Sequence, residues 1–379
     1  MAIPFIASEE RRLLRDGLRR WGAARDVRSA EDFAETWRFA AGQGWLMAGL
    51  PEAAGGLGGD AFDMAVIAEE WGRALLRAPL VEAMVAARVL LAAAPEALGP
   101  VIAGDAIMLL AHDEPAARGD PLWVETRARE GHGGWRLTGR KTAIVGAGHA
   151  DRLLVSARLP GGALALFALD AAEAPLKSFT TIDDRSGGEL RLDDTPATLL
   201  AAKAQPALRE AFDHGLMLEA AEAVGAMERA FELTRDYLLT RRQYGQYLAE
   251  FQALRHRIAD MFIELEQARS IVLRGLEALG VDAGGRAGGG DADRRAALAS
   301  AVKARVAQAG MFVCGQAIQL HGGIGVTDEY PVGHFFKRML AFDLRHGGGA
   351  AQVARFAALG GATGRQSCGT LVARSPPCP

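Results

Sequence analysis

The sequence predicts an α+β multidomain protein with an N-terminal helical domain, a central antiparallel β domain and a C-terminal four-helix bundle. Three observations predict this order. Residues 8–101 carry short amphipathic segments, residues 106–201 carry short alternating runs, and long helical patterns follow. We expect the domains to span 1–105, 106–204 and 205–360, with 361–379 as an unpacked tail.

The first domain is predicted from helical periodicity. EERRLLRDGLRRW, which begins at residue 9, places apolar residues three and four apart on a charged background. Further helices are expected over about 32–42, 61–76 and 80–93. Residues 44–60 contain Pro51 and paired glycines, which predict an irregular connection. This segment has neither a P-loop pattern nor a strand-anchored G-x-G-x-x-G, so we interpret it as a structural turn.

The middle of the chain is predicted to form strands. IMLLAH, WRLTGRKTAIV, DRLLVSARL, ALALFAL and GELRLDD are short apolar or alternating runs separated by Gly, Asp and Pro. The alternation in WRLTGR suggests a sheet with one packed face and one wet face.

The last domain is predicted from long apolar stripes. From Leu254 to Leu279 the apolar residues recur at intervals of four and three, which suits left-handed antiparallel helix packing. A glycine-rich link is expected over 280–293. A third long helix should end at Gly322 and Gly323, and a final helix is expected over about 333–345.

Composition excludes several classes of protein. Lys and Arg total 43 against 46 Asp and Glu, a net charge of −3, so no strong basic field favours nucleic acid. Three cysteines without a C-x-x-C pair predict neither a disulfide framework nor a metal site. No apolar run approaches 18 residues and no secretory signal is evident, so we expect a soluble cytoplasmic protein without a membrane span.

Several motifs together resemble the acyl-CoA dehydrogenase family. TRRQYGQYLAEFQALRHRIADM (240–261) resembles the family signature R-x-Q-F-G…F-Q…A-D-M, and QLHGGIGVTDEYP (319–331) resembles Q-x-x-G-G-x-G…E-x-P. GLPEAAGGLGGD, AHDEPAARGD and LTGRKTAIVGAGHADRLLVSAR resemble its helical-domain loop and β-domain motifs. The resemblance covers roughly residues 8–358 in the family's order.

Within the family, the chain is most similar to the small subunit of bacterial heteromeric enzymes such as pimeloyl-CoA dehydrogenase. EAVGAMERAFELT, ADMFIELEQARS and QLHGGIGVTDEYPVGHFFKR carry this similarity.

The resemblance implies FAD as the cofactor and acyl-CoA as the substrate. Arg241 matches the family's pyrophosphate-contacting arginine, because a fixed guanidinium can bind phosphates through charge-assisted bonds. Outside the motif, Arg241 would be read as a solvated cation at a helix end, and Arg242 as a surface or partner contact. Phe251 and Gln252 match the adenine-side pair. Gln319, Gly322 and Gly323 match the stretch that approaches the nucleotide from a neighbouring subunit, although the glycines alone would read as a helix cap.

The same resemblance implies partners. The family's FAD site is built across a subunit interface, so we expect a dimer or tetramer formed with a homologous partner subunit or with itself. An acceptor of the electron-transfer flavoprotein type is also implied.

The catalytic base of the family is missing. The usual glutamate lies sixteen residues past the Tyr of E-Y-P, which is His346 here, and the second family position falls on Gly215, followed by Leu216 where a substrate-binding Arg often stands. A histidine could abstract a proton at neutral pH, but we prefer to interpret His346 as a helix-end cap. Of the nearby acids Asp213, Glu219 and Glu222, helical phase predicts that the last two point elsewhere.

The flavin-facing motifs also differ from the family pattern. Asp113 replaces a threonine that contacts the flavin's pyrimidine edge, where a carboxylate would oppose the negative charge of reduced flavin. Ala143 and Val145 replace the Trp and Thr that pack against and bond the flavin ring.

We therefore hypothesise an FAD-dependent acyl-CoA dehydrogenase that acts as one subunit of a hetero-oligomer, whose partner supplies the catalytic Glu. The alternative is a structural or regulatory subunit of the same fold that binds no flavin. A third possibility is a homomeric flavin enzyme that uses another base or runs another reaction.

Overall fold

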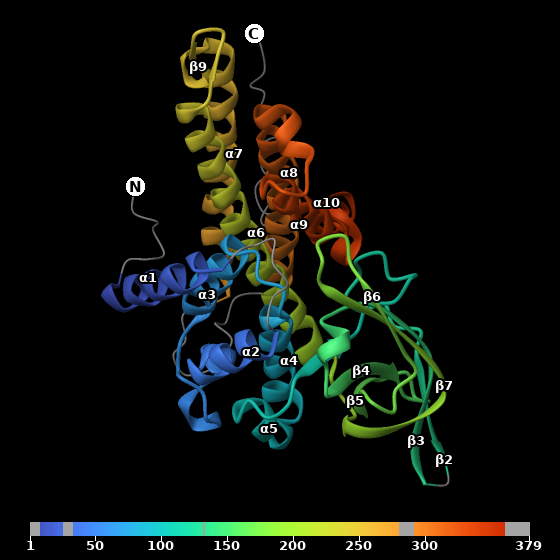
Figure 1. Cartoon of the computed structure of the whole chain (residues 1–379). Helices are drawn as coiled ribbons and strands as arrows, with labels where there is room; N and C mark the ends of the chain where they lie inside the picture. The colour runs from blue at the N-terminus through green and yellow to red at the C-terminus, as the bar shows by residue number, and fades with distance from the viewer. Residues whose placement is uncertain (1–7, 26–32, 132, 280–291, 361–379) are drawn as a thin grey trace, which may run out of the picture.

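The computed structural model describes residues 8–25, 33–131, 133–279 and 292–360. The predicted three-part architecture is confirmed, with helices, then a sheet, then a long helical bundle along the chain (Figure 1). The predicted link 280–293 and tail 361–379 lie largely or wholly outside the described residues. Among the residues that the structure describes, no helix is long and apolar enough to cross a membrane.

The N-terminal helices begin with well-formed caps. Ser8 accepts a hydrogen bond from the backbone N–H of Arg11, and Asp60 forms a capping box with Asp63. The residues between the second and third helices form short 3₁₀ turns with glycines at positive φ, as the sequence predicted. The helices are α1 (Glu9–Ala23), α2 (Phe33–Gly42), α3 (Ala61–Arg73), α4 (Leu80–Ala93) and the short α5 (Gly99–Ile102).

The β domain forms one seven-stranded sheet in the order β1-β4-β2-β3-β7-β5, with β6 paired to β7 and β4 also paired to β5. Most pairs are antiparallel, but β1 and β2 both pair in parallel with β4, a detail the sequence did not predict. The strands are β1 (Met108–Ala111), β2 (Arg127–Gly131), β3 (Gly134–Val145), β4 (Arg152–Arg158), β5 (Leu164–Asp170), β6 (Leu176–Thr180) and β7 (Ser186–Ala201).

The C-terminal bundle is built from α6 (Gln205–Thr240), α7 (Gln252–Ala278), α8 (Ala292–His321) and α9 (Val332–Leu344), followed by α10 (Gly348–Ala358). The predicted apolar stripe of α7 faces inward, since Met261, Leu265, Val272 and Leu276 are buried. A small hairpin, β8 (Arg242–Gln243) with β9 (Gln246–Tyr247), links α6 to α7 at the end of the bundle remote from the sheet (Figure 1). The sequence did not predict α10.

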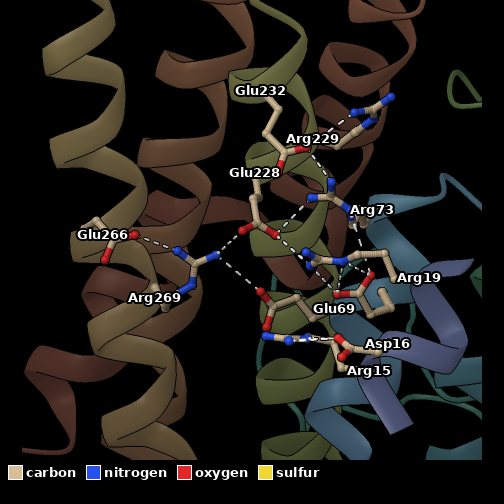
Figure 2. Close-up of polar contacts among 11 residues, drawn as sticks. Arg15, Asp16, Arg19, Glu69, Arg73, Glu228, Arg229, Glu232, Glu266 and Arg269 are labelled. Carbon is tan, nitrogen blue, oxygen red and sulfur yellow. Dashed lines mark hydrogen bonds and ion pairs between the residues drawn. The ribbon is translucent and has the colours of Figure 1, made fainter. Parts of the chain in front are cut away.

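Ion pairs fasten the N-terminal helices to the bundle (Figure 2). Arg269 of α7 lies 3.3 Å from both Glu69 of α3 and Glu228 of α6. Arg73 of α3 binds Glu228 at 3.1 Å, and Arg19 of α1 also reaches Glu228 at 3.3 Å. These charges hold α1, α3, α6 and α7 in one fixed arrangement.

Candidate functional site

A pocket lies where the N-terminal helices, the sheet and the bundle meet. Its walls are mostly apolar, formed by α4, β1 and the first turns of α6, and its floor is charged. The lining residues that the chemistry uses are Asp113, Gly215, Glu219, Arg345 and His346. The cavity measures about 70 Å³, enough for a few water molecules.

The two family positions for the catalytic base meet in this pocket. Gly215 comes from α6 and His346 from the link between α9 and α10, and both line the same cavity. Neither supplies a carboxylate. The two positions that the family motifs assign to the base therefore lie in one pocket, although the motifs did not identify a base there.

His346 is held between two carboxylates. Its Nδ1 lies 3.2 Å from Oδ2 of Asp113, and its Nε2 lies 3.0 Å from Oε1 of Glu219. These two negative charges outweigh burial and raise the pKa of His346 to about 9. The interpretation of His346 as a helix cap was wrong, because its ring forms ion pairs inside the pocket.

The histidine's charge also changes the role of Asp113. His346 lowers the pKa of Asp113 to about 2, although burial alone would raise it. The carboxylate is therefore neutralised by an imidazolium and is not left facing the pocket unpaired. A histidine that stays protonated at neutral pH cannot accept a proton, so His346 does not suit the role of general base.

Glu219 is the site residue that the sequence analysis missed. It lies one turn after Gly215 on α6, and residues four apart share a helix face, so the predicted phase was wrong. Arg345 binds Glu219 at 2.9 Å, and Arg345 and His346 together lower the pKa of Glu219 against the effect of burial. Glu222 does point elsewhere, toward Arg338. Buried Asp213 binds Arg295 and Arg355.

A buried polar cluster fixes the loop that carries Asp113. Lys141 of β3 binds Glu114 at 2.7 Å and the carbonyl of His112 at 3.2 Å. The backbone N–H of Thr142 donates to the carbonyl of Asp113 at 2.9 Å. Asp113 is thus held beside Ala143, which adopts φ +54° at an irregular step in the β3–β7 pairing.

The predicted nucleotide-binding residues gather at the other end of the bundle. The ring of Tyr237, one turn before Arg241, lies 4.4 Å from that of His321, which precedes Gly322. The backbone N–H of Leu248 donates to the carbonyl of Arg241 at 2.9 Å, which keeps the segment leading to Phe251 and Gln252 close by. At 1.5 Å per residue, Arg241 lies about 39 Å along α6 from Gly215, farther than one extended FAD molecule reaches.

The remote end fits the phosphates and adenosine of a dinucleotide. Arg241 is exposed, and its guanidinium has no hydrogen bond or ion pair with the residues that the structure describes. Gln319, Gly322 and Gly323 are exposed as well. No atom of the described chain lies within 4 Å of where a Cβ would stand on either glycine, so a ligand could approach their backbone closely.

The pocket does not fit a flavin ring. An apolar cavity of about 150 Å³ holds a single benzene ring, whereas this cavity is about 70 Å³ and a flavin has three fused rings. Asp113, His346 and Glu219 occupy the floor. The chain is therefore suited to the nucleotide end of FAD at one extremity, whereas the pocket at the other extremity is too small for the ring.

Comparisons with known proteins agree with this architecture. Residues 8–99 match the family described as "Acyl-CoA dehydrogenase, N-terminal domain", and residues 206–358 match "Acyl-CoA dehydrogenase, C-terminal domain". Acyl-CoA dehydrogenase FadE12 of Mycobacterium tuberculosis is 31% identical over 358 residues, covering 86% of this chain and 90% of the relative. Acyl-CoA dehydrogenase IpdE2 of the same species is 30% identical over 294 residues, with 76% and 74% covered.

Solved structures give the same result. A variant of the steroid ACAD named Tcur3481-Tcur3483 is 31% identical with a TM-score of 0.81, covering 93% of this chain and 97% of that one. The ChsE4-ChsE5 complex of Mycobacterium tuberculosis is 24% identical with a TM-score of 0.80, covering 93% and 98%, and shows the shared fold. The chain therefore belongs to the acyl-CoA dehydrogenase family.

Proposed function

We propose that this chain is one subunit of a hetero-oligomeric, FAD-dependent acyl-CoA dehydrogenase, and that a homologous partner supplies the catalytic glutamate. The observation that carries the proposal is the division of the site within one chain. Arg241 and the glycine loop at 322–323 are open, and Arg241 pairs with none of the described residues, while the pocket at Gly215 and His346 lacks a base and a space for the ring.

In this assembly the chain binds the nucleotide part of a flavin whose ring lies in the partner. Arg241 holds the pyrophosphate, Phe251 and Gln252 contact the adenosine side, and the backbone at Gly322 and Gly323 lies against the nucleotide. When bound, the flavin supplies the electron acceptor for α,β-desaturation of an acyl-CoA thioester, and an electron-transfer flavoprotein-type acceptor reoxidises it. Family membership and the predicted motifs support this scheme.

The relatives support a two-chain assembly. The steroid enzyme that is 31% identical to this chain has a two-part name, Tcur3481-Tcur3483. The resemblance to the small subunit of pimeloyl-CoA dehydrogenase points the same way. We also propose a cytoplasmic location and acyl-CoA as the substrate class.

One observation favours the alternative of a structural subunit that binds no flavin, namely the small cavity. The alternative does not explain why Arg241, at the same end of the bundle as the open glycine loop, has no partner among the described residues. A homomeric enzyme that uses His346 as its base is disfavoured by the raised pKa of His346.

The test combines turnover with flavin stoichiometry. The purified chain alone should oxidise acyl-CoA poorly with an artificial electron acceptor, because loss of a general base costs a factor of about 10²–10⁴ in rate. Addition of a companion chain of the same fold that carries an E-G-T motif should restore turnover, with one flavin for each pair of chains. A flavin in every chain, or robust turnover by the lone protein that disappears in His346→Ala, would contradict the proposal.

Arg241→Ala probes the shared flavin directly. Loss of a charge-assisted phosphate contact should weaken flavin retention by the complex by about 1.5–3 kcal/mol, or roughly 10- to 150-fold. Arg242→Ala is the matched control, because the Arg242 guanidinium lies 4.5 Å from the centre of the Tyr247 ring and already makes a cation–π contact with it. Equal flavin affinity in the two variants would assign Arg241 to the ordinary surface and favour the structural-subunit alternative.

A further inference from the structure

Two loops meet at the pocket, and each contributes charged side chains to its lining. One is 113–119 of the β domain, and the other is 345–348 between α9 and α10. Asp113 of the first loop binds His346 of the second, which in turn binds Glu219 on α6. We call the two loops together with Glu219 the latch.

The backbones of the two loops also touch. A Cβ built on Gly119 would lie 2.2 Å from the carbonyl oxygen of His346, and one built on Gly347 would lie 2.4 Å from that of Arg118. Both glycines adopt positive φ, +87° and +85°. Only residues without side chains allow this approach, so backbone contacts as well as ion pairs hold the two loops together.

The latch is anchored from behind. Arg345 joins Glu219 to Glu82 of α4, each at 2.9 Å. Glu82 also lies 3.4 Å from Arg185, in the turn between β6 and β7. Glu219 and Arg185 are buried, Glu82 and Arg345 are largely buried, and together they come from all three domains. Separation of the loops would therefore leave charges without their partners, which is costly inside a protein.

The walls behind the latch suit a flat ring, although the space does not. Val85, Leu109, Leu208, Ala211 and Phe212 give the pocket apolar sides. Flat aromatic ligands bind between such walls when a few polar groups lie at the edge. The imidazole of His346 (15% exposed) lies between Asp113 and Glu219 and takes up space in the cavity.

We propose that the latch is an autoinhibitory contact, which excludes a planar heteroaromatic ring of the isoalloxazine type from this chain's own pocket, and that removal of the Asp113–His346 pair opens the pocket to such a ring. The inference concerns the lone chain and does not need a partner. It explains why Asp113 and His346 occur together. Without His346, the Asp113 carboxylate would lose its counter-charge, and without Asp113, the His346 imidazolium would keep only Glu219.

The test uses the double variant Asp113→Thr/His346→Gly and lumiflavin, an isoalloxazine without ribityl or phosphate groups. Glycine suits position 346, because His346 adopts φ +55°, where glycine is relaxed. Removal of the imidazole enlarges the cavity, and loss of the ion pair between residues 113 and 346 releases the two loops from each other, so that they can separate and admit the ring. Removal of Asp113 also avoids an unpaired carboxylate. We expect the full-length variant to quench lumiflavin fluorescence with at least tenfold higher affinity than the wild-type chain.

Two controls make the result specific. Asp194→Asn removes an exposed carboxylate that pairs with Arg129 of the sheet, far from the lining of the pocket, and should bind lumiflavin no better than wild type. Added imidazole should refill the space left by His346 and displace lumiflavin from the double variant, while leaving free lumiflavin fluorescence unchanged.

Two outcomes would overturn the inference. Wild-type protein that binds lumiflavin as tightly as the double variant would show that the pocket is not closed. A double variant that retains the wild-type circular dichroism spectrum but still excludes lumiflavin would show that other contacts close it. Lumiflavin has no phosphate that Arg241 could bind. A negative result with lumiflavin therefore does not bear on the proposed FAD site shared with the partner, which the flavin stoichiometry of the complex tests separately.

Discussion

At the scale of single residues, the charge of the pocket depends on Asp113 and His346 together. Asp113 alone suggested a negative charge set against a reduced flavin, and His346 alone suggested a helix cap. The structure places them 3.2 Å apart, so each supplies the counter-charge of the other. The two departures from the expected family pattern therefore compensate each other in charge.

This pairing predicts a pH dependence of stability. The folded pKa of His346 is raised to about 9 from 6.5, so its stabilising contribution is fully present below pH 6.5 and is lost as the pH rises through 9. At 1.36 kcal/mol per pKa unit, the loss is about 3 kcal/mol. Denaturant unfolding at pH 6.5 and 9.5 should show this loss for wild type.

His346→Gln is the matched variant for that experiment. Other groups that titrate in this range, including Lys141 and Lys303, remain in both proteins and largely cancel in the difference. The gap in unfolding free energy between wild type and variant should narrow as the pH rises. A gap that is constant across this range would show that His346 is not held as an imidazolium.

At the scale of elements, buried charges hold helices from different domains in register. Arg269 is 8% exposed and binds Glu69, Glu228 and Glu266 from three helices (Figure 2). Burial raises the pKa of Glu69 to about 7, even with Arg269 beside it. The ionised form of Glu69 therefore depends on the positive charge of Arg269.

Arg269→Met should destabilise the protein by about 3 kcal/mol near pH 8, because it leaves a buried carboxylate uncompensated. The cost should shrink near pH 5, where Glu69 takes up a proton. Arg274→Met on the same helix breaks only an exposed pair with Glu277 and should cost about 0.5 kcal/mol or less. Equal costs for the two variants in denaturant unfolding would contradict a special role for Arg269.

At the scale of the whole molecule, α7 exposes a small group of apolar side chains, bordered by polar ones that include Glu266 and Arg305. Phe262 and Ile263 of α7 are 45% and 51% exposed and line a groove of about 650 Å³ that also includes Ile271. Exposed apolar patches of this kind mark surfaces that another chain covers. The proposed hetero-oligomer needs such a surface.

Phe262→Asp should weaken association with the companion chain at least tenfold, because a carboxylate in an apolar interface must be desolvated. Native mass measured by light scattering over a concentration series would show the change. Leu13→Asp is the control, since Leu13 of α1 is 67% exposed but lies on another helix, outside the groove. Unaltered assembly of Phe262→Asp would place the interface elsewhere.

Local patterns accounted for most of the fold. Helix α4 covers 80–93 as its periodicity indicated, and α8 ends at His321, just before Gly322. Helix α10 was missed because GGAAQVARFAA begins with glycines and has a short apolar stripe. The parallel β1–β4 pairing was missed because alternation shows which face of a strand is buried, but not which neighbour it has.

The sequence by itself determined the three-part order of the chain, its family and the motif that carries Arg241, because each depends on residues close together in the chain or on fixed spacing. Only the tertiary structure decided that Glu219 enters the pocket and that His346 lies between Glu219 and Asp113. These contacts join a β-domain loop, the first bundle helix and the link after α9. Their energies come from burial and opposite charge across domain boundaries, which no local pattern records.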